Sequence, residues 1–249
     1  MESVYIAGID IGTSGAKAIV FDLDGIPIAS AYNEYGSIYP RPNWVEQDAE
    51  LIVESAMRSM REAVARSGVN PRAISSVSLS AQRCCAIFLD EDERLIRPMI
   101  SWQDNRPVEE LAEVERAFPD GAFYRRTGYP ASTTWLLPKI LWVRSREPET
   151  WRKTARIVQM HDYFLRALGA EDYFVDYNDA GFFGFFDSQD YVWDKEMLDA
   201  FGIPERLLPI PRASATAAGT VSAAGAERSG LRAGTRIAIG AGDQCAGSL

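Results

Sequence analysis

Short apolar runs separated by polar bends open the chain. Residues 4–7 and 18–21 are apolar and rich in isoleucine and valine, and a glycine-rich segment lies between them. This pattern predicts two strands joined as a hairpin. Residues 22–25 (DLDG) form a predicted turn into a third apolar run at residues 26–29. The N-terminal region is therefore expected to begin an antiparallel sheet.

Further along the chain, segments whose apolar residues have a helical period alternate with segments typical of strands. Asp48 is a predicted N-cap for a helix that runs to about Ser67, with apolar residues on one face, and Gly68 ends it. Strands are predicted at residues 74–80, 86–89 and 236–239, with a short apolar segment at residues 99–102. Helices are predicted from Pro107 to Phe118, at residues 138–146, 148–154 and 160–168, and between Asp194 and Gly202, with a short turn at residues 204–206. Residues 176–179 and 181–186 are expected to be irregular or β.

This mixture of helices and strands, with an antiparallel start and no internal repeat, predicts an α/β fold with a mixed sheet. The length of 249 residues allows one large domain or two small ones. A hydrophobic content of 47% and a charged content of 24% are typical of a globular soluble protein.

Charge and cysteine content exclude several classes of function. The net charge of −9 argues against nucleic acid or an anionic membrane as a partner through a general basic surface. No apolar run approaches the roughly 20 residues that cross a bilayer, and the start of the chain lacks the basic region of a signal peptide. Cys84, Cys85 and Cys245 form no C-x-x-C motif. Reduced thiols in a cytoplasmic protein are the simplest interpretation.

The glycine-rich segment at residues 8–17 (GIDIGTSGAK) carries one carboxylate, two hydroxyls and a lysine. Glycines let backbone N–H groups approach phosphate oxygens, and a carboxylate can hold Mg²⁺. An ordinary hairpin turn is the simpler alternative. We expect Asp10 to be buried at the end of an apolar strand, where a carboxylate needs a partner, and this favours a phosphate or metal site.

Asp243 repeats this pattern, because a short apolar strand leads into Gly-x-Gly and then an aspartate at residues 240–244 (GAGDQ). An aspartate at a glycine-rich strand end can act as a general base beside a substrate hydroxyl. Taken alone, the motif is more often a turn.

Several segments, in order along nearly the whole chain, resemble the FGGY carbohydrate kinases, which include glycerol, xylulose and gluconate kinases. They are residues 8–14 (GIDIGTS), 44–48 (WVEQD), 78–83 (SLSAQR), 101–106 (SWQDNR), 138–142 (PKILW), 176–180 (DYNDA) and 240–244 (GAGDQ). The resemblance implies an actin-like ATPase domain of the ribonuclease H-like type, with a mixed β-sheet flanked by helices. It also implies ATP and Mg²⁺ as cofactors and a sugar or polyol as the small-molecule substrate.

The resemblance also implies roles for individual residues. Asp243 matches the general base, and Asp10 matches the aspartate that holds the metal and the ATP phosphates. Gly12, Thr13 and Ser14 match the phosphate turn. Lys17 lies where some members place a basic residue, and a strand-edge lysine is the equal alternative. The substrate residues implied by the matching segments are Gln82, Arg83, Cys84, Trp102, Asp104 and Gln244.

Other choices stay open at the level of sequence. Asp104 and Arg106 either touch substrate or form a structural ion pair, and Asp179 is expected to be structural. His161, the only histidine, is expected on the surface or in the core rather than in catalysis. Xylulose kinases have Gln-Met-His and glycerol kinases have Gln-Arg-Glu where this chain has Gln82-Arg83-Cys84, so it fits neither. A pentulose such as xylulose is favoured, with glycerol, gluconate or another polyol as alternatives.

Family members are about twice as long as this chain. The expected organisation is one N-terminal, sugar-binding domain over residues 1–249, without the C-terminal half that carries the adenosine pocket. The chain alone is then expected to be inactive, to expose an apolar former interface, and to form a homodimer when full length. A non-catalytic sugar-binding domain and an actin/Hsp70-like ATPase are the alternative functions.

Overall fold

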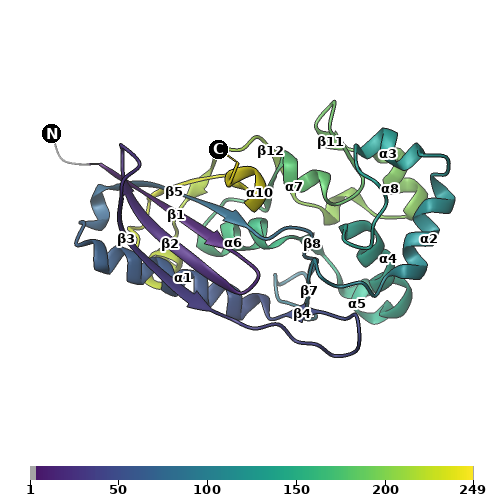
Figure 1. The fold of residues 1–249 in the computed structure, drawn as a ribbon, viewed down its shortest axis with the longest axis horizontal. Helices are drawn as coiled ribbons and strands as arrows, with labels where there is room; N and C mark the ends of the chain where they lie inside the picture. The colour runs from purple at the N-terminus through teal and green to yellow at the C-terminus, as the bar shows by residue number, and fades with distance from the viewer. Residues whose placement is uncertain (1–3, 249) are drawn as a thin grey trace.

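The computed structural model describes residues 4–248. Within that range a seven-stranded mixed sheet lies beside a largely helical region (Figure 1). The strand order is β13-β14-β5-β1-β2-β3, and β15 also pairs with β5. Its strands are β1 (Tyr5–Ile11), β2 (Gly15–Asp22), β3 (Pro27–Glu34), β5 (Ile74–Ala81), β13 (Ala217–Thr220), β14 (Arg236–Ala238) and β15 (Ala241–Gly242).

Three neighbouring strands end at the same edge of this sheet. β1 and β5 are parallel, with Ile11 opposite Ala81, and β15 is parallel to β5, with Gly242 opposite Ala81. The turn after β1, the loop after β5 and the residue after β15 therefore meet at one place. This convergence follows from strand pairing between segments that are far apart in the sequence.

The opening hairpin is confirmed, but its bend is shorter than predicted. β1 continues through Ile11 and β2 begins at Gly15, so Asp10 pairs with Lys17 within the ladder. The strand persists through this segment because β1 is a central strand that pairs with β2 on one side and β5 on the other. The predicted phosphate loop is thus two strand ends and a short turn.

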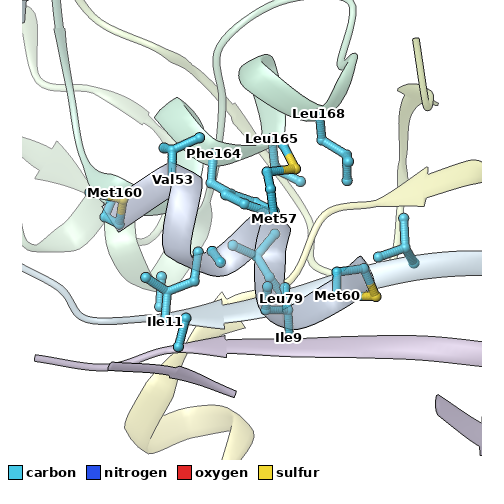
Figure 2. Packing of buried hydrophobic residues seen from close by; sticks show 14 of the residues in the cluster. Ile9, Ile11, Val53, Met57, Met60, Leu79, Met160, Phe164, Leu165 and Leu168 are labelled. Atoms are coloured by element: carbon cyan, nitrogen blue, oxygen red, sulfur yellow. The ribbon is translucent and has the colours of Figure 1, made fainter. Parts of the chain in front are cut away.

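Three helices cover one face of the sheet. They are α1 (Ala49–Ser67), α6 (Met160–Leu168) and α9 (Ala223–Ser229). Figure 2 shows side chains of α1 and α6 packed against Ile9, Ile11 and Leu79 of the sheet. The predicted ends of α1 are confirmed: the side chain of Asp48 accepts a hydrogen bond from the Leu51 N–H, and Gly68 is left-handed with φ of 65°.

The second region has its own aromatic core, which includes Phe183, Phe185 and Trp193. Its helices are α2 (Val108–Ala117), α3 (Ala122–Thr127), α4 (Leu136–Arg146), α5 (Pro148–Lys153), α7 (Tyr177–Gly181) and α8 (Lys195–Phe201). Short ladders pair β4 (Glu46–Gln47) with β7 (Met99–Ile100), β6 (Ile87–Leu89) with β8 (Arg156–Val158), β9 (Phe174–Asp176) with β12 (Ile210–Arg212), and β10 (Phe186–Asp187) with β11 (Val192–Trp193). The remaining elements are η1 (Pro71–Ala73), η2 (Glu205–Leu207) and α10 (Asp243–Ala246).

The prediction of irregular or β structure at residues 176–179 is wrong, because residues 177–179 belong to helix α7, Tyr177–Gly181. The Asp176 side chain causes this, because it caps the helix by accepting hydrogen bonds from the N–H groups of Asn178 and Asp179. The short helices α3 and α9 were also not predicted. Among the residues described, no helix has the length and apolar character needed to span a bilayer.

Candidate functional site

A cavity of about 280 Å³ lies where β1, β5 and β15 end. We call it the strand-end pocket. It is lined by Thr13, Gln82, Arg83, Cys84, Trp102, Thr134, Trp135, Phe182, Asp243 and Gln244. The structure thus brings together most of the substrate residues implied by the sequence, along with Thr13 of the phosphate turn and Asp243.

Arg83 is the organising side chain of this pocket. Its Nε lies 3.1 Å from Oδ1 of Asp243, and its Nη1 donates to Oδ1 of Asn178 at 3.2 Å. Nη2 donates to the side-chain oxygen of Gln244. The guanidinium also lies 4.4 Å from the ring centroid of Phe182, a cation–π contact that limits its movement.

Asp243 is held at one oxygen and accessible at the other. Its Oδ1 contacts Arg83 and accepts the N–H of Gln244 at 2.7 Å. The side chain keeps 43% of its surface exposed. Among the described residues only Oδ1 has a partner, and Asp243 lines the pocket, so the carboxylate keeps an oxygen that can accept a proton.

The walls of the pocket offer neutral hydrogen-bonding groups. Gln82 Nε2 donates to Oε1 of Gln47 at 3.0 Å, while Gln82 Oε1 is buried and has no partner among the residues described. Trp102 donates its ring N–H to Oγ1 of Thr13 at 3.0 Å. The Thr13 hydroxyl proton then remains free to donate into the pocket.

Cys84 presents a small uncharged group. Burial raises the pKa of its thiol to about 12, so it stays a thiol at neutral pH. Its backbone is left-handed, with φ of 61°. Hydrogen bonds at both ends hold this conformation: its N–H donates to Gln159 Oε1, and its C=O accepts from the buried Lys139 Nζ, each at 2.7 Å.

Asp10 lies outside the strand-end pocket and, contrary to the prediction, is exposed. Side chains alternate across a strand, so Asp10 points away from the face on which Ile9 and Ile11 pack against helices. Its Oδ1 accepts a hydrogen bond from the Ser80 hydroxyl at 2.7 Å. Asp10 and Lys17 instead line a separate, mostly apolar groove of about 600 Å³ on the open face of the sheet.

The turn between β1 and β2 is braced by its neighbours. Gly12 N–H donates to Gly15 C=O at 3.0 Å, and the Tyr35 hydroxyl donates to Gly12 C=O at 2.6 Å. Gln47 Nε2 donates to the C=O of Thr13 at 2.8 Å. Ser14 is exposed. This turn separates the groove that contains Asp10 from the strand-end pocket that contains Thr13.

Asp104 does not line the strand-end pocket. It is fully buried, its Oδ2 accepts the Val45 N–H at 2.6 Å, and Arg106 Nη2 contacts the same oxygen at 2.7 Å. Arg106 also contacts Glu46 at 2.9 Å and stacks 4.0 Å from the Trp44 ring centroid. Of the two alternatives for Asp104 and Arg106, the geometry is that of a structural ion pair.

Sequence reasoning missed several contributors to the pocket. Thr134 and Trp135 carry no motif, and Phe182 lies in a segment that was expected only to be irregular or β. Asn178 lies in a recognised segment, but only the fold shows that it binds Arg83. No local signal marks Thr134, Trp135 or Phe182 as pocket residues. Only folding brings their segments to the ends of β1, β5 and β15.

His161 is a core residue, as one of the two expectations had it. It is fully buried, and its Nε2 accepts the N–H of Gly240 at 3.2 Å. Burial lowers the pKa of its imidazole to about 4, so the ring is neutral. It thereby connects α6 to the segment that carries Asp243.

Comparisons with known proteins show which proteins this chain is similar to. Glycerol kinase 1 of Pseudomonas aeruginosa is 32% identical over 213 residues, which cover 83% of this chain and 43% of that protein. The xylulose kinase of Lactococcus lactis subsp. lactis is 29% identical over 248 residues, covering 98% of this chain and 48% of that protein. The chain spans about half the length of the curated relatives it matches.

A solved structure and a family model confirm the expected fold class. The crystal structure of xylulose kinase from Rhodospirillum rubrum matches with a TM-score of 0.93 at 25% identity, covering 98% of this chain and 50% of that one. The model of the "FGGY family of carbohydrate kinases, N-terminal domain" matches residues 5–249. The chain belongs to the FGGY family of carbohydrate kinases.

Proposed function

We propose that this chain forms the sugar-binding half of a kinase that transfers the γ-phosphoryl group of ATP to a hydroxyl of a sugar or polyol. The observation that carries the proposal is the position of Asp243, accessible in a pocket of neutral hydrogen-bonding groups and contacted at 3.1 Å by Arg83. The half-length match to glycerol and xylulose kinases supports the same organisation.

The pocket residues have separate roles in the proposed reaction. A substrate hydroxyl lies against Asp243, while Arg83, Gln82 Oε1 and the Thr13 hydroxyl orient the other hydroxyls. Asp243 accepts the hydroxyl proton as the oxygen attacks the γ-phosphorus. A new P–O bond forms, the bond between the γ-phosphorus and its bridging oxygen breaks, and ADP leaves with that electron pair.

The opposite side of the hairpin turn fits the phosphates and their metal. An exposed carboxylate is a suitable oxygen ligand for Mg²⁺ or its waters, and Asp10 is oriented for this by Ser80. The turn at Gly12, Thr13 and Ser14 offers hydroxyls and backbone N–H groups to phosphate oxygens. Bound Mg²⁺ would neutralise developing charge on the transferred group. Lys17 lies opposite Asp10 across the ladder and supplies a positive charge nearby.

The charges in the strand-end pocket favour an uncharged substrate. Arg83 is the one cation among the described lining residues, and its guanidinium already contacts Asp243, Asn178 and Gln244. An anion such as gluconate would have no unpaired cation there. We therefore propose a neutral polyol or ketose, with a pentulose such as xylulose first and glycerol second.

Ligand-induced stabilisation of the 249-residue chain tests the proposal. A ligand that binds only the folded state raises the melting temperature, so D-xylulose or glycerol should raise it and sodium gluconate should not. The variant Arg83→Met should lose the shift while staying folded. If no member of a panel of neutral sugars and polyols raises the melting temperature of the chain, the sugar-binding proposal fails.

Assays of phosphoryl transfer and ATP hydrolysis separate the alternative functions. Sugar binding without phosphoryl transfer in the complete polypeptide that carries this chain would indicate a non-catalytic sugar-binding domain. ATP hydrolysis that no sugar stimulates would indicate an actin/Hsp70-like ATPase. A homodimer of the whole protein and a cytoplasmic location stay predictions.

A further inference from the structure

Three buried carboxyl groups lie directly behind the strand-end pocket. Asp162, Asp176 and Asp179 have no exposed surface. Both side-chain oxygens of Asp179, Oδ2 of Asp176 and Oδ1 of Asp162 have no hydrogen-bond partner among the residues described. A buried carboxylate without a donor is strongly unfavourable, so either a cation or protons must neutralise this cluster.

A metal ion does not suit the cluster. His161, Asp176 and Asp179 each place one ligand atom within 4.8 Å of the others. However, His161 Nε2 uses its lone pair to accept the Gly240 N–H, which assigns the ring proton to Nδ1. Neither nitrogen then has a lone pair for an ion, and the histidine that would complete the site is lost.

The hydrogen bonds show where a proton belongs. Asp176 Oδ1 accepts the N–H groups of Asn178 at 2.9 Å and Asp179 at 3.3 Å, and these donors stabilise its charge. The Asp179 carboxyl has no such donor. Burial, and next the charge of Asp176, raise the pKa of Asp179 well above its ordinary value of 3.8.

The same carboxyl lies against the segment that carries Asp243. A Cβ placed on Gly242 would lie 2.5 Å from Asp179 Oδ1 and 2.3 Å from Arg83 Cδ, so both side chains pack on Gly242. The backbone C=O of Asp179 accepts Gln159 Nε2 at 2.8 Å, and the other end of the Gln159 amide accepts the N–H of Cys84. Asp179 is thus fixed relative to two walls of the pocket.

We propose that Asp179 is a positioning residue that stays protonated and donates a hydrogen bond to the Asp176 carboxylate. The charge of Arg83 is then left to Asp243 and the substrate. The role in sugar binding rests on the proposed function. An ionised Asp179 would compete for Arg83, whose Nη1 already donates to the adjacent Asn178. A neutral Asp179 removes that competition while still filling the space beneath Gly242.

Several charged or titratable groups from different elements face Asp179. They are Arg83, Cys84 and Cys85 after β5, Tyr129 after α3, His161 and Asp162 on α6, Asp176 at the end of β9, and Asp243 beyond Gly242. Arg83 is the one cation in this set. The proton on Asp179 is therefore what keeps the charge of Arg83 directed at the pocket.

The sign of the pH effect follows from where the proton is held. The folded chain keeps a proton on Asp179 above pH 3.8, where the unfolded chain has lost it. Stability from this group is complete below that pH and declines as pH rises toward the folded-state pKa. Burial raises the pKa of Asp162 to about 8, so this group also lowers stability as pH rises. Asp179→Asn should remove the part of the pH dependence that is due to Asp179, and Asp162→Asn the part that is due to Asp162.

A carbon-13 NMR titration of the aspartate carboxyls of the 249-residue chain tests the protonation state directly. Asp179→Asn identifies the Asp179 resonance by its disappearance. We expect that resonance at the protonated position at pH 7. A carboxylate resonance for Asp179 at pH 7 would overturn the proposal. This measurement needs no sugar, so its outcome is independent of whether the proposed function holds.

The affinity for a neutral sugar supplies the functional readout. At pH 7 Asp179→Asn should bind within about twofold of the parent, because the amide mimics a protonated carboxyl, while Asp179→Ala should lose about tenfold or more. The affinity of the parent for the sugar should fall as pH rises, with its midpoint at the pH where NMR shows Asp179 ionising. The affinity of Asp179→Asn should not fall in this way. Asp187→Asn, which alters a turn aspartate elsewhere, is the matched control and should keep the pH dependence of the parent.

Two results would refute the positioning role. One is a loss of sugar affinity in Asp179→Asn at pH 7 that is as large as in Asp179→Ala, which would mean that the negative charge of Asp179 is needed. The other is an alkaline loss of affinity that persists unchanged in Asp179→Asn. If the parent binds no sugar at all, the proposed function fails, and the NMR titration still decides the protonation state.

Discussion

The aspartates of the two glycine-rich segments, Asp10 and Asp243, are held in place by different kinds of contact. Asp10 lies in a strand of seven residues that pairs along its whole length with its neighbour in the hairpin, where it faces Lys17. Asp243 follows a strand of only two residues, Ala241–Gly242. The first position is thus held by backbone ladders along the whole of β1, to β2 and to β5, and the second mainly by side chains that contact its segment.

Those partners come from three distant segments. Arg83 contacts Asp243 itself, His161 accepts the N–H of Gly240, and Asp179 packs against Gly242. A ladder of two residues contributes few hydrogen bonds, so the position of Asp243 depends on these side chains. The difference teaches that the phosphate side of the site, held by backbone ladders, should tolerate changes of single side chains better than the sugar side does.

The largest effect is expected for Asp243→Ala in the complete polypeptide that carries this chain. Loss of a general base should lower kcat by about 10²–10⁴-fold, while sugar affinity changes little because Arg83 and the pocket walls remain. Steady-state kinetics and sugar titration measure the two quantities. Retained turnover would refute the assignment of Asp243 as the base.

Asp10→Asn should come next, with a loss in kcat of about a hundredfold, since the variant loses the charged oxygen that suits Mg²⁺. Sugar affinity of the 249-residue chain should be unchanged, because Asp10 lies outside the strand-end pocket. Ser80→Ala removes only the hydroxyl that orients Asp10 and is the milder companion variant. A drop in sugar affinity in Asp10→Asn would contradict the separation of the two sides.

Gly240→Ala should destabilise the fold by about 1–3 kcal/mol, as overpacking does. Its Cβ would lie 1.6 Å from the backbone oxygen of Leu79, so one of the two paired segments must move. Urea unfolding measures the free energy, and sugar affinity should fall with it. Gly36→Ala is the matched control, because nothing lies within 4 Å of its Cβ. Equal stability of the two variants would show that the Asp243 segment is less constrained than the contacts indicate.

Gly12→Ala should have the smallest effect, below about 0.5 kcal/mol in the free energy of unfolding. Its Cβ would make an ordinary contact at 3.4 Å with the C=O of Gly15. The comparison with Gly240→Ala in the same urea series is the sharpest test of the local hairpin against the remotely held segment. A cost for Gly12→Ala as large as that for Gly240→Ala would remove the distinction.

The sequence by itself determined the local elements. The hairpin at the N-terminus, the helix from Asp48 to Gly68 and the capped helix after Asp194 all formed as predicted. Their signals are apolar periodicity and capping groups, which act over a few residues and need no partner from elsewhere. The family segments also placed Gln82, Arg83, Trp102, Asp243 and Gln244 together, and the pocket contains all of them.

Only the tertiary structure decided how charges are paired and which are exposed. The contact of Arg83 with Gln244 spans 161 residues and that with Asn178 spans 95. Asp104 is buried in an ion pair, Asp10 is exposed, and Asp179 is buried near Asp176 with no hydrogen-bond partner for its carboxyl oxygens among the residues described. The charge state of a carboxyl depends on its burial and on the donors around it. Burial, and distant donors such as Ser80 for Asp10 and the Val45 N–H for Asp104, depend on segments that meet only in the folded chain, so no local pattern in the sequence could specify them.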